Sequence, residues 1–436
     1  MNETGKRKIK FTTGIKVILM FGLISFFGDM AYESARGNHG QYMALLGIDI
    51  VTVSFIAGIG EFIAYAIRIV SGIWADKVRR YWPFVFAGYG LVISVPLTGL
   101  VRESDSAWIF LLVFIMMERI GKALRSPAKD TIVSTVAEGE DKIGTGFAFG
   151  WQEALDRAGA AVGPLLFTLV FVLTGREGLR EYATGYLLLG IPFVLLILTV
   201  CLTFGKVKKA QIMETRLKAV DTSGEPEKLP PVFWTYCIFT FFSLIGFVTF
   251  VPIGFFLAST GVFSSVQIHL TDSFVLKENA VIPLLYSLVM ATNAVLAVFI
   301  GIIYDKIKKK TGNKHSGLLM LVFVPFVSAI FPFLFLSNSI PLIITGFIVY
   351  GIILATHSTI MRASIADVVS LRKRGTGYGI FNTAFGLALM IGSIIFGYLI
   401  TNFEVIYVQG FTIGAQIIAL AVFIVMRQQI GKSNTA

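Results

Sequence analysis

Ionisable side chains stand inside several stretches of this sequence that are otherwise apolar. Asp29 and Glu33 are four residues apart in the first of these stretches, and Glu153 and Arg157 have the same spacing in a later one. Residues four apart lie on one face of a helix, so the members of each pair can act together. A charge is costly to bury among apolar groups, and we therefore treat these residues as candidates for a functional site. The candidates are Asp29, Glu33, Glu61, Arg68, Glu118, Arg119, Glu153, Asp156 and Arg157.

These charges suggest proton exchange and the binding of charged groups. A partly desolvated carboxylate such as Asp29 can take up or release a proton when the solvent around it changes. The other acidic candidates have the same capacity, and the arginines can balance them or bind an anionic group of a ligand. For Glu33 a second interpretation stays open, in which it only pairs with Arg36 near the membrane surface.

A local ion pair is the simplest role for Glu153 and Arg157. Glu153 precedes Arg157 by about one helical turn, so the two side chains can reach each other. We expect a further partner for this pair to be Glu118 or Arg119 from a neighbouring stretch. Both a structural and a functional role for the pair remain open.

Motifs for several other kinds of site are missing from the sequence. The four histidines have no metal-ligand spacing, and there is neither a Cys-x-x-Cys pair nor a Gly-x-x-x-x-Gly-Lys-Ser/Thr loop. Cys201 and Cys237 lie in separate apolar stretches, which does not indicate a disulfide framework. We therefore expect no metal, no cofactor and no ATP-driven step, and we do not expect an enzyme.

The elements that must hold these charges are membrane-spanning helices. Of the 436 residues, 55% are hydrophobic and only 14% are charged, and the mean hydropathy is +0.78. So few charges cannot cover a soluble protein of this size. About 20 apolar residues cross a bilayer as a helix, which predicts an all-α polytopic membrane protein with twelve transmembrane helices. The spans are expected near 14–35, 50–75, 83–101, 107–124, 145–174, 182–204, 233–258, 281–304, 317–336, 342–361, 376–402 and 409–427.

The positive charges indicate how these spans are oriented. Of the 37 lysines and arginines, 28 fall in segments that would lie on one side of the membrane and five in segments on the other. Positively charged loops face the cytoplasm, so we expect a multi-pass protein of the plasma membrane with both termini cytoplasmic. The same asymmetry accounts for the net charge of +11, which therefore does not indicate nucleic-acid binding.

A short motif occurs twice, about half the chain apart. Residues 72–80 read GIWADKVRR, and residues 301–309, which lie 229 positions further on, read GIIYDKIKK. A second pair of similar segments starts at Asp130 and at Asp367. An internal repeat of this kind indicates two similar halves. The expected division is a six-helix bundle in 1–204, a cytoplasmic linker in 205–232 and a second six-helix bundle in 233–436.

At these residues the sequence resembles the major facilitator superfamily. The repeated motif is similar to that superfamily's Gly-x-x-x-Asp-Arg/Lys-x-Gly-Arg-Arg/Lys motif, which lies on a cytoplasmic loop between two spans. Arg79 and Lys308 stand where the second glycine of the motif is expected. The matching residues are Gly72, Asp76, Lys77 and Arg80 in the first copy and Gly301, Asp305, Lys306 and Lys309 in the second.

The resemblance implies two six-helix bundles around a central cavity, with alternating access by rocking of the halves. It also implies that the motif charges latch the cytoplasmic side closed, and Arg68 is a candidate for the same network. In the alternative interpretation, the basic residues of these loops only set the topology. Where the halves meet, two polar residues of the second half are candidates to face Glu61 or Asp156. They are Asn293 and Asn382.

A third motif resembles the drug:proton antiporters of this superfamily. Gly159, Gly163 and Pro164 match the Gly-x-x-x-Gly-Pro pattern of that branch, but Phe167 and Thr168 replace the two glycines of its longer form. Small residues four apart also let two helices approach closely, and a proline kinks the helix that carries it. A helix-packing role is the alternative to an antiporter signature.

Together these features predict a secondary transporter for a small organic molecule. We expect proton-coupled efflux by antiport in a functional monomer, with the lipid bilayer, the substrate and protons as its partners. Proton symport or facilitated uptake of a sugar or organic acid is the alternative. A non-transporting membrane sensor or integral enzyme is less expected, because no extramembrane segment exceeds about 28 residues.

Overall fold

The computed structural model describes residues 12–137, 145–209, 228–264, 266, 268–271, 274–276, 278–312, 315–369 and 374–432. Their regular structure is helical apart from one short hairpin, in which β1 (Ile268–Thr271) pairs antiparallel with β2 (Phe274–Leu276). The predicted helical membrane fold is thus confirmed, and the hairpin is an addition that the sequence did not suggest.

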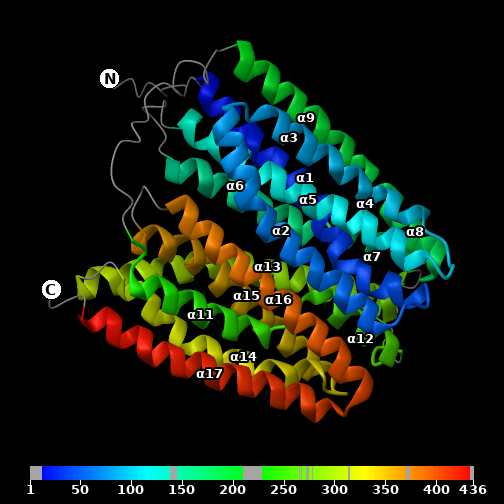
Figure 1. Ribbon diagram of the computed structural model, residues 1–436. Coiled ribbons are helices and arrows are strands. Elements are labelled where there is room, and N and C mark those ends of the chain that lie inside the picture. Colours follow the sequence, from blue (N-terminus) through cyan, green and yellow to red (C-terminus); the bar gives the residue numbers. More distant parts are fainter. Residues whose placement is uncertain are drawn as a thin grey trace, which may run out of the picture.

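The described helices form two groups. The first bundle comprises α1 (Thr13–Leu45), α2 (Ile50–Val78), α3 (Trp82–Gly90), η1 (Leu91–Ile93), α4 (Ser94–Leu97), η2 (Thr98–Leu100), α5 (Ala107–Ala137), α6 (Thr145–Val162), α7 (Leu165–Thr174), α8 (Leu179–Leu188) and α9 (Gly190–Lys209). The second bundle comprises α11 (Pro231–Ile245), α12 (Phe250–Thr260), α13 (Glu278–Thr311), η3 (Ser316–Phe323), α14 (Val324–Phe335), α15 (Ile340–Val368), α16 (Arg374–Asn402) and α17 (Val405–Lys432). Figure 1 shows the bundles next to each other, with both ends of the chain on one side of the molecule. We call that side the terminal face and the opposite side the far face.

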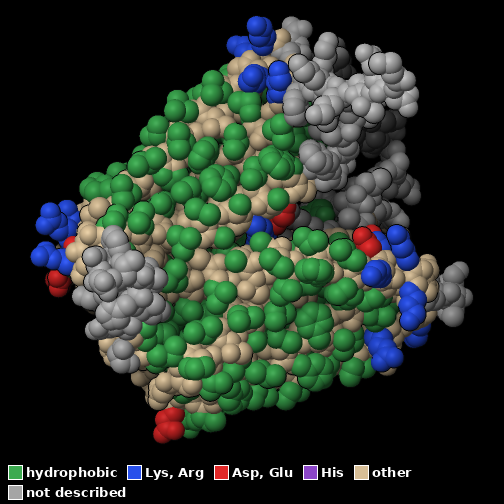
Figure 2. Space-filling model, turned by 180° about the vertical axis from the view of Figure 1, so that it is seen from behind, with side chains coloured by type: hydrophobic (Ala, Val, Ile, Leu, Met, Phe, Trp, Pro, Cys, Tyr) green, Lys and Arg blue, Asp and Glu red, His purple; other side chains and the backbone are tan. Residues whose placement is uncertain are grey.

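The number of membrane-spanning helices is close to the prediction. Eleven helical segments of the described chain are long and apolar enough to cross a membrane. The remaining expected span, 107–124, lies in α5, which is long enough but carries Glu118, Arg119 and Lys122 within that stretch. Hydrophobic side chains cover the sides of the molecule seen in Figure 2, as contact with lipid requires, and most of the visible charges lie towards its two ends.

Some helices extend well beyond the expected spans. α1 continues to Leu45, so Arg36 lies inside this helix and not in an external loop as predicted. α5 likewise continues to Ala137. Hydropathy detects only the apolar part of a helix, whereas a helix packed inside a bundle can continue through polar residues. Both extensions bring charged residues into the interior.

Other expected spans are interrupted. Pro164 separates α6 from α7, as predicted for a residue that cannot donate a backbone hydrogen bond. The span expected at 233–258 is divided between α11 and α12, with Gly246 as the C-cap of α11 and Thr249 as the N-cap of α12.

The ends of α2 are set by two different devices. Asp49 caps its start by accepting hydrogen bonds from the backbone N–H of Thr52 at 2.9 Å and from the Thr52 hydroxyl at 2.6 Å. Partial burial would raise the pKa of the Asp49 carboxyl, but these hydrogen bonds outweigh burial and hold the pKa below its usual value. Arg79 ends the helix in the left-handed conformation, with φ 52° and ψ 28°. Among the described residues it alone combines a side chain with a positive φ.

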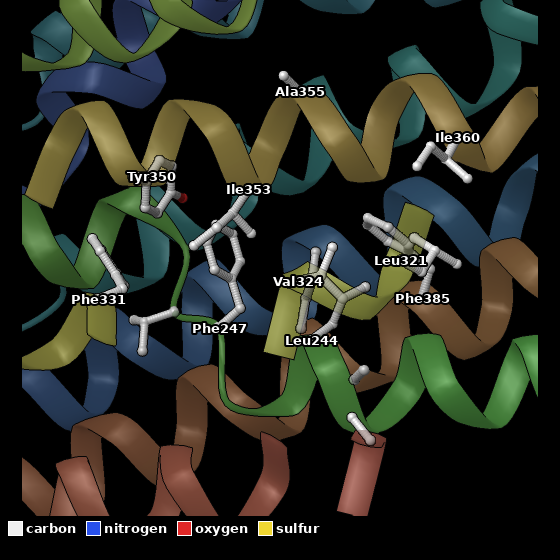
Figure 3. Packing of buried hydrophobic residues seen from close by; sticks show 14 of the residues in the cluster. Leu244, Phe247, Leu321, Val324, Phe331, Tyr350, Ile353, Ala355, Ile360 and Phe385 are labelled. Carbon is white, nitrogen blue, oxygen red and sulfur yellow. The ribbon is translucent and has the colours of Figure 1, made fainter. Parts of the chain in front are cut away.

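Each bundle has its own hydrophobic core. In the second bundle, Phe247 stacks on Tyr350 with the ring centroids 4.6 Å apart, and Phe331 lies 5.2 Å from the same tyrosine ring. Figure 3 shows these side chains beside Leu244 and Ile353. Large aromatic rings bury much apolar area, so this cluster stabilises the wall of the second bundle that faces the first.

The bundles meet along α2 and α16. Gly58 of α2 lies against the backbone of Met390, and Gly386 of α16 lies against the backbone of Phe62. A side chain at either glycine would separate the helices, because glycine lets two backbones approach closely. This seam holds the two bundles together beside the cavity described below.

A second contact closes the far face. Gly40 of α1 lies against the backbone of Val251 and Phe255 in α12, and Gly37 lies against the ring of Tyr286 in α13. The Thr168 hydroxyl of α7 donates to the backbone carbonyl of Ala280 at 3.4 Å. The first and second bundles are therefore packed together on the side away from the termini.

Candidate functional site

A cavity of about 210 Å³ lies between the bundles. The first bundle lines it mostly with charged and polar side chains, and the second supplies three apolar side chains, one histidine and one serine. Figure 2 shows acidic and basic side chains in the recess between the bundles. The lining residues are Ser25, Gly28, Asp29, Glu33, Arg36, Tyr65, Arg68, Tyr89, Lys122, Arg125, Ser126, Lys129, Asp130, Gln152, Glu153, Asp156, Arg157, Met290, Leu354, His357, Ser358 and Phe385.

Most of the charged candidates from the sequence meet in this place. Six of them line the cavity: Asp29, Glu33, Arg68, Glu153, Asp156 and Arg157. The other three do not line it and are almost fully buried: Glu61, which lines the smaller pocket described below, Glu118 and Arg119. Four helices of the first bundle, α1, α2, α5 and α6, carry the whole set.

Glu61 is the centre of a buried charge network. Its carboxylate accepts a close hydrogen bond from Arg36 of α1 and lies 3.2 Å from the guanidinium of Arg119 in α5. Arg119 also lies 3.4 Å from Glu118. Two arginines on two other helices therefore balance one carboxylate of α2, and the ion pairs tie the three helices together.

Two tyrosines complete this network. The Tyr32 hydroxyl accepts hydrogen bonds from Arg119 and, at 3.4 Å, from Arg36. Tyr286 of the second bundle donates its hydroxyl proton to Glu33, and Arg36 lies 3.9 Å from Glu33. Glu33 thus joins the two bundles, in addition to the pairing with Arg36 that the sequence suggested.

A second cluster lies nearer the terminal face. Lys129 donates to the Ser25 hydroxyl at 3.1 Å and interacts electrostatically with Asp156 and Asp29. Asp29 and Asp156 are also electrostatic neighbours of each other. The two acids on α1 and α6 therefore share one lysine of α5.

The expected ion pair within α6 is confirmed. The Arg157 guanidinium donates to one oxygen of Glu153 from both Nε, at 3.0 Å, and Nη2, at 2.8 Å. Arg119, one of the two further partners suggested for this pair, forms ion pairs with Glu61 and Glu118, and a further partner for the pair stays a prediction.

The two asparagines of the second bundle do not join the charged cluster. Asn293 is fully buried, and its side-chain N and O have no hydrogen-bond partner among the described residues. The side-chain oxygen of Asn382 also lacks one there. Glu61 pairs with the arginines of its own bundle, and an asparagine facing Glu61 or Asp156 stays a prediction.

A smaller apolar pocket of about 60 Å³ adjoins the cavity. The two spaces share Arg36, Tyr65, Met290, Leu354, His357 and Phe385. The pocket is further lined by side chains of the second bundle, among them Phe247, Tyr286 and Tyr350. A polar space and an aromatic space therefore share one wall.

Sequence reasoning missed several residues of the site. The expected spans end at residues 35 and 124, so Arg36, Arg125 and Lys129 fall outside them and Lys122 falls at the end of one. On α5 these three follow Arg119 at spacings of three, three and four residues, which is one helical face. This spacing would have predicted that the three cations share a helical face with Arg119. The prediction requires knowing that the helix continues past residue 124.

The repeated motif differs in structure between its two copies. In the first, Gly72 lies against Pro127 of α5, and Lys77 and Arg80 are exposed. The side chain of Asp76 lies outside the described residues. Arg79, at the position of the expected glycine, adopts the left-handed backbone that glycine favours.

In the second copy the helix continues through the motif. Lys308 pairs with Asp367 of α15 at 2.6 Å, and the Tyr304 hydroxyl donates to the same carboxylate at 2.8 Å. This ion pair lies within the second bundle. The charges of this copy that match the motif are all exposed: Asp305, Lys306 and Lys309. A latch between the bundles thus stays a prediction, as does the pairing of Arg68 with it; Arg68 lines the cavity.

The small residues of α6 pack against α1. A side chain at Gly159 would collide with the backbone of Phe26 and Met30, and one at Gly163 with the backbone of Met30 and the side chain of Ser34. The packing role expected for Gly159, Gly163 and Pro164 is therefore present, and it holds Asp156 beside α1.

Known proteins resemble this chain along most of its length. The sequence model of the family described as Major Facilitator Superfamily matches residues 15–326 and 312–435. An uncharacterized protein of Mycobacterium tuberculosis is 30% identical over 387 residues, which cover 88% of this chain and 86% of that protein. An uncharacterized MFS-type transporter of Methanocaldococcus jannaschii is 27% identical over 391 residues, 88% of each chain.

Solved structures are similar in fold. A POT family transporter in complex with a thioalcohol conjugated peptide has a TM-score of 0.70 at 14% identity, over 95% of this chain and 96% of that one. A nucleoside transporter has a TM-score of 0.67 at 14% identity, over 94% and 99% of the two chains. At such identities the similarity concerns the fold and not the substrate.

Proposed function

The chain belongs to the major facilitator superfamily, and from this premise we propose that it is a secondary transporter that exchanges a small organic molecule for protons. The family and the fold are those of membrane transporters. The coupling, the direction and the kind of substrate are our proposals.

The observation that carries the proposal is the charged cavity between the bundles. Its residues on α1 run from Ser25 to Arg36, and beyond them Gly37 and Gly40 pack against the second bundle. This arrangement supports a substrate pathway that is closed at the far face. Rocking of the bundles about the seam of α2 and α16 would expose the same cavity to the other side.

Proton coupling is supported by the acids around Lys129. Asp29 and Asp156 both interact electrostatically with Lys129. The number of protons that the two acids hold therefore depends on how closely the Lys129 ammonium approaches each of them. A charged solute bound in the cavity, or a change in hydration, would alter this balance and favour release or uptake of a proton. We assign Asp29 and Asp156 as the main proton carriers and leave Glu61, Glu118 and Arg119 a structural role.

Efflux by antiport is favoured over uptake by the partial motif of Gly159, Gly163 and Pro164. We also propose that the terminal face is cytoplasmic in the plasma membrane, since the loops expected there hold most of the lysines and arginines. We further propose that the protein works as a monomer, since helices of both bundles of one chain line the cavity. The division at 205–232 is proposed with the linker on the cytoplasmic side.

Proteoliposomes loaded with the pH-sensitive dye pyranine test the coupling. Panels of organic acids, amines and sugars are added outside, and the proton movement that each one drives is recorded. We expect at least one solute to drive protons outwards as it enters, and Asp29→Asn together with Asp156→Asn to abolish this movement. Solute accumulation that is unaffected when a protonophore collapses the gradient would contradict proton coupling.

Symport is the alternative, and the same measurement separates the two. A solute that carries protons in the same direction as itself would replace antiport by symport. The carboxylate variants would still be expected to lose the proton movement, because both modes need a titrating group in the cavity.

A further inference from the structure

Apart from Lys129, which donates to Ser25 and has Asp156 and Asp29 as electrostatic neighbours, three cations of the cavity have no carboxylate within ion-pair distance in the part of the chain that the structure describes. They are Arg68 of α2 and Lys122 and Arg125 of α5. Arg125 is only 4% exposed, and one of its terminal nitrogens, Nη1, has no hydrogen-bond partner among the described residues. The Nε of Arg68 is likewise without one. Acids lie near only at longer range, with Asp29 and Glu33 acting on Lys122.

Aromatic rings hold these cations in place. The Arg68 guanidinium lies 4.9 Å from the ring centre of Tyr65, and the Arg125 guanidinium lies 4.8 Å from that of Tyr89. The Lys122 ammonium lies 3.7 Å from the ring centre of Tyr32. A guanidinium stacked on a ring keeps the N–H groups at its edge available as donors. Such a fork matches the two oxygens of a carboxylate or phosphate.

The opposite wall of the cavity is mainly apolar. Met290, Leu354 and Phe385 of the second bundle line it, and all three also line the smaller aromatic pocket next to it. A ligand that fills both spaces would meet cations at one end and hydrocarbon or aromatic surface at the other.

We propose that the transported solute is an organic anion with an apolar body, whose anionic group binds to Arg68, Lys122 and Arg125. Its apolar part lies on the wall of Met290, Leu354 and Phe385. Burying a guanidinium without a counter-charge destabilises a protein, and the ligand supplies the missing charge. This inference rests on the proposed transport function and adds to it the chemical class of the solute.

Binding to the purified protein tests the class without any transport step. The thermal unfolding midpoint in dodecyl maltoside is measured against matched solutes with the same ring: 3-phenylpropionate, 3-phenylpropan-1-ol and 3-phenylpropylamine. Propionate is added as an acid without the ring. We expect 3-phenylpropionate to raise the midpoint saturably, and the other three to bind at least about tenfold more weakly, because they lack the charge-assisted bond or the apolar contact. Equal stabilisation by the alcohol or the amine, or none by 3-phenylpropionate, overturns the proposal.

Variants locate the site. Arg68→Gln and Arg125→Gln should each weaken 3-phenylpropionate binding about tenfold. Phe385→Ala should weaken the binding of 3-phenylpropionate but not the binding of inorganic phosphate. Arg180→Gln, at an exposed arginine outside the cavity, should bind as the unaltered protein does. If Arg125→Gln does not fold, Arg125→Lys keeps the charge without the fork and should still weaken binding. Wild-type affinity in the Arg68 and Arg125 variants would refute the site.

The two proposals fail in different ways. A protein that binds 3-phenylpropionate through Arg125 but moves no protons in pyranine-loaded vesicles would contradict proton coupling and leave the anion site intact. A protein that exchanges protons for 3-phenylpropylamine and does not bind the acid would contradict only the anion site.

Discussion

Glu61 and Glu153 are both carboxylates paired with arginine, but their surroundings differ. Glu61 is 3% exposed and lies between Arg36 and Arg119 from two other helices. The side chain of Glu153 is 34% exposed, and its partner Arg157 is one turn away on the same helix. The first pair is shielded from water and organises three helices, whereas the second is a local pair that water screens.

Glu61→Gln should therefore destabilise the protein strongly. The substitution removes the carboxylate that the buried Arg119 and the partly buried Arg36 share, which costs about 3–5 kcal/mol. Glu153→Gln is the matched control and should cost no more than about 0.5 kcal/mol. Thermal unfolding midpoints in detergent check both. Similar midpoints for the two variants would show that the Glu61 network does not hold the helices together.

The sequence could predict only the local part of the site. The spacing of Glu153 and Arg157 determines their contact, since both lie on one helix. The contact of Glu61 with Arg36 and Arg119 depends on how three helices pack, which spacing does not encode. Hydropathy indicates which charged residues lie inside the protein. It does not indicate which residues they pair with.

At the scale of the element, the two copies of the motif show how similar sequences end helices differently. α2 stops at Arg79, whereas α13 passes through the equivalent Lys308 and ends at Thr311, just before Gly312. Gly312 has a φ of 69°, so each helix ends beside a residue in the left-handed conformation. In the second copy a glycine takes that conformation, and in the first an arginine does.

Replacing Arg79 by glycine should stabilise the protein. A residue with a side chain is strained at a φ of 52°, and glycine removes a cost of about 1 kcal/mol there. Arg80→Gly removes the same charge from the neighbouring exposed position, which lacks a positive φ. This control should be neutral or destabilising by about 0.5 kcal/mol, because glycine makes the unfolded chain more flexible. Equal effects of the two substitutions on the unfolding midpoint would mean that Arg79 is not strained.

The contact of α6 with α1 depends on small residues of α6, among them Gly159. Gly159→Ala should cost about 1–3 kcal/mol, because the added methyl group would collide with backbone atoms of α1 that cannot move aside. Gly150→Ala on the same helix has open space around it and should gain up to about 1 kcal/mol from helix propensity. Unfolding midpoints of the two variants should shift in opposite directions. A loss of stability at Gly150 as well would assign the effect to α6 itself and not to its contact with α1.

At the scale of the whole molecule, the helical membrane fold was predictable, because hydropathy and the repeat of 72–80 depend on composition and order alone. The break at Pro164 was predictable for the same reason. The extension of α1 through Arg36 was not, since tertiary packing and not hydropathy keeps that turn helical. This extension brings Arg36 to Glu61.

The hydrogen bond between Tyr286 and Glu33 joins the two bundles near the closed far face. Glu33 is 7% exposed and Tyr286 is 1% exposed, so the bond is shielded from water. It exists only while the bundles are packed together on that side. Removing it should raise the population of molecules that are open there.

Tyr286→Phe tests this with a reporter cysteine at the interface. In a chain with both native cysteines replaced by serine, Thr168→Cys places a thiol where α7 contacts the start of α13. A hydrogen bond to a charged group is worth about 1.5–3 kcal/mol, so its loss should increase labelling by an impermeant maleimide outside intact cells about tenfold or more. Tyr350→Phe removes a hydroxyl from the same aromatic pocket and should leave labelling unchanged. Equal labelling in both variants would show that other contacts, such as Gly40 against α12, keep the far face closed.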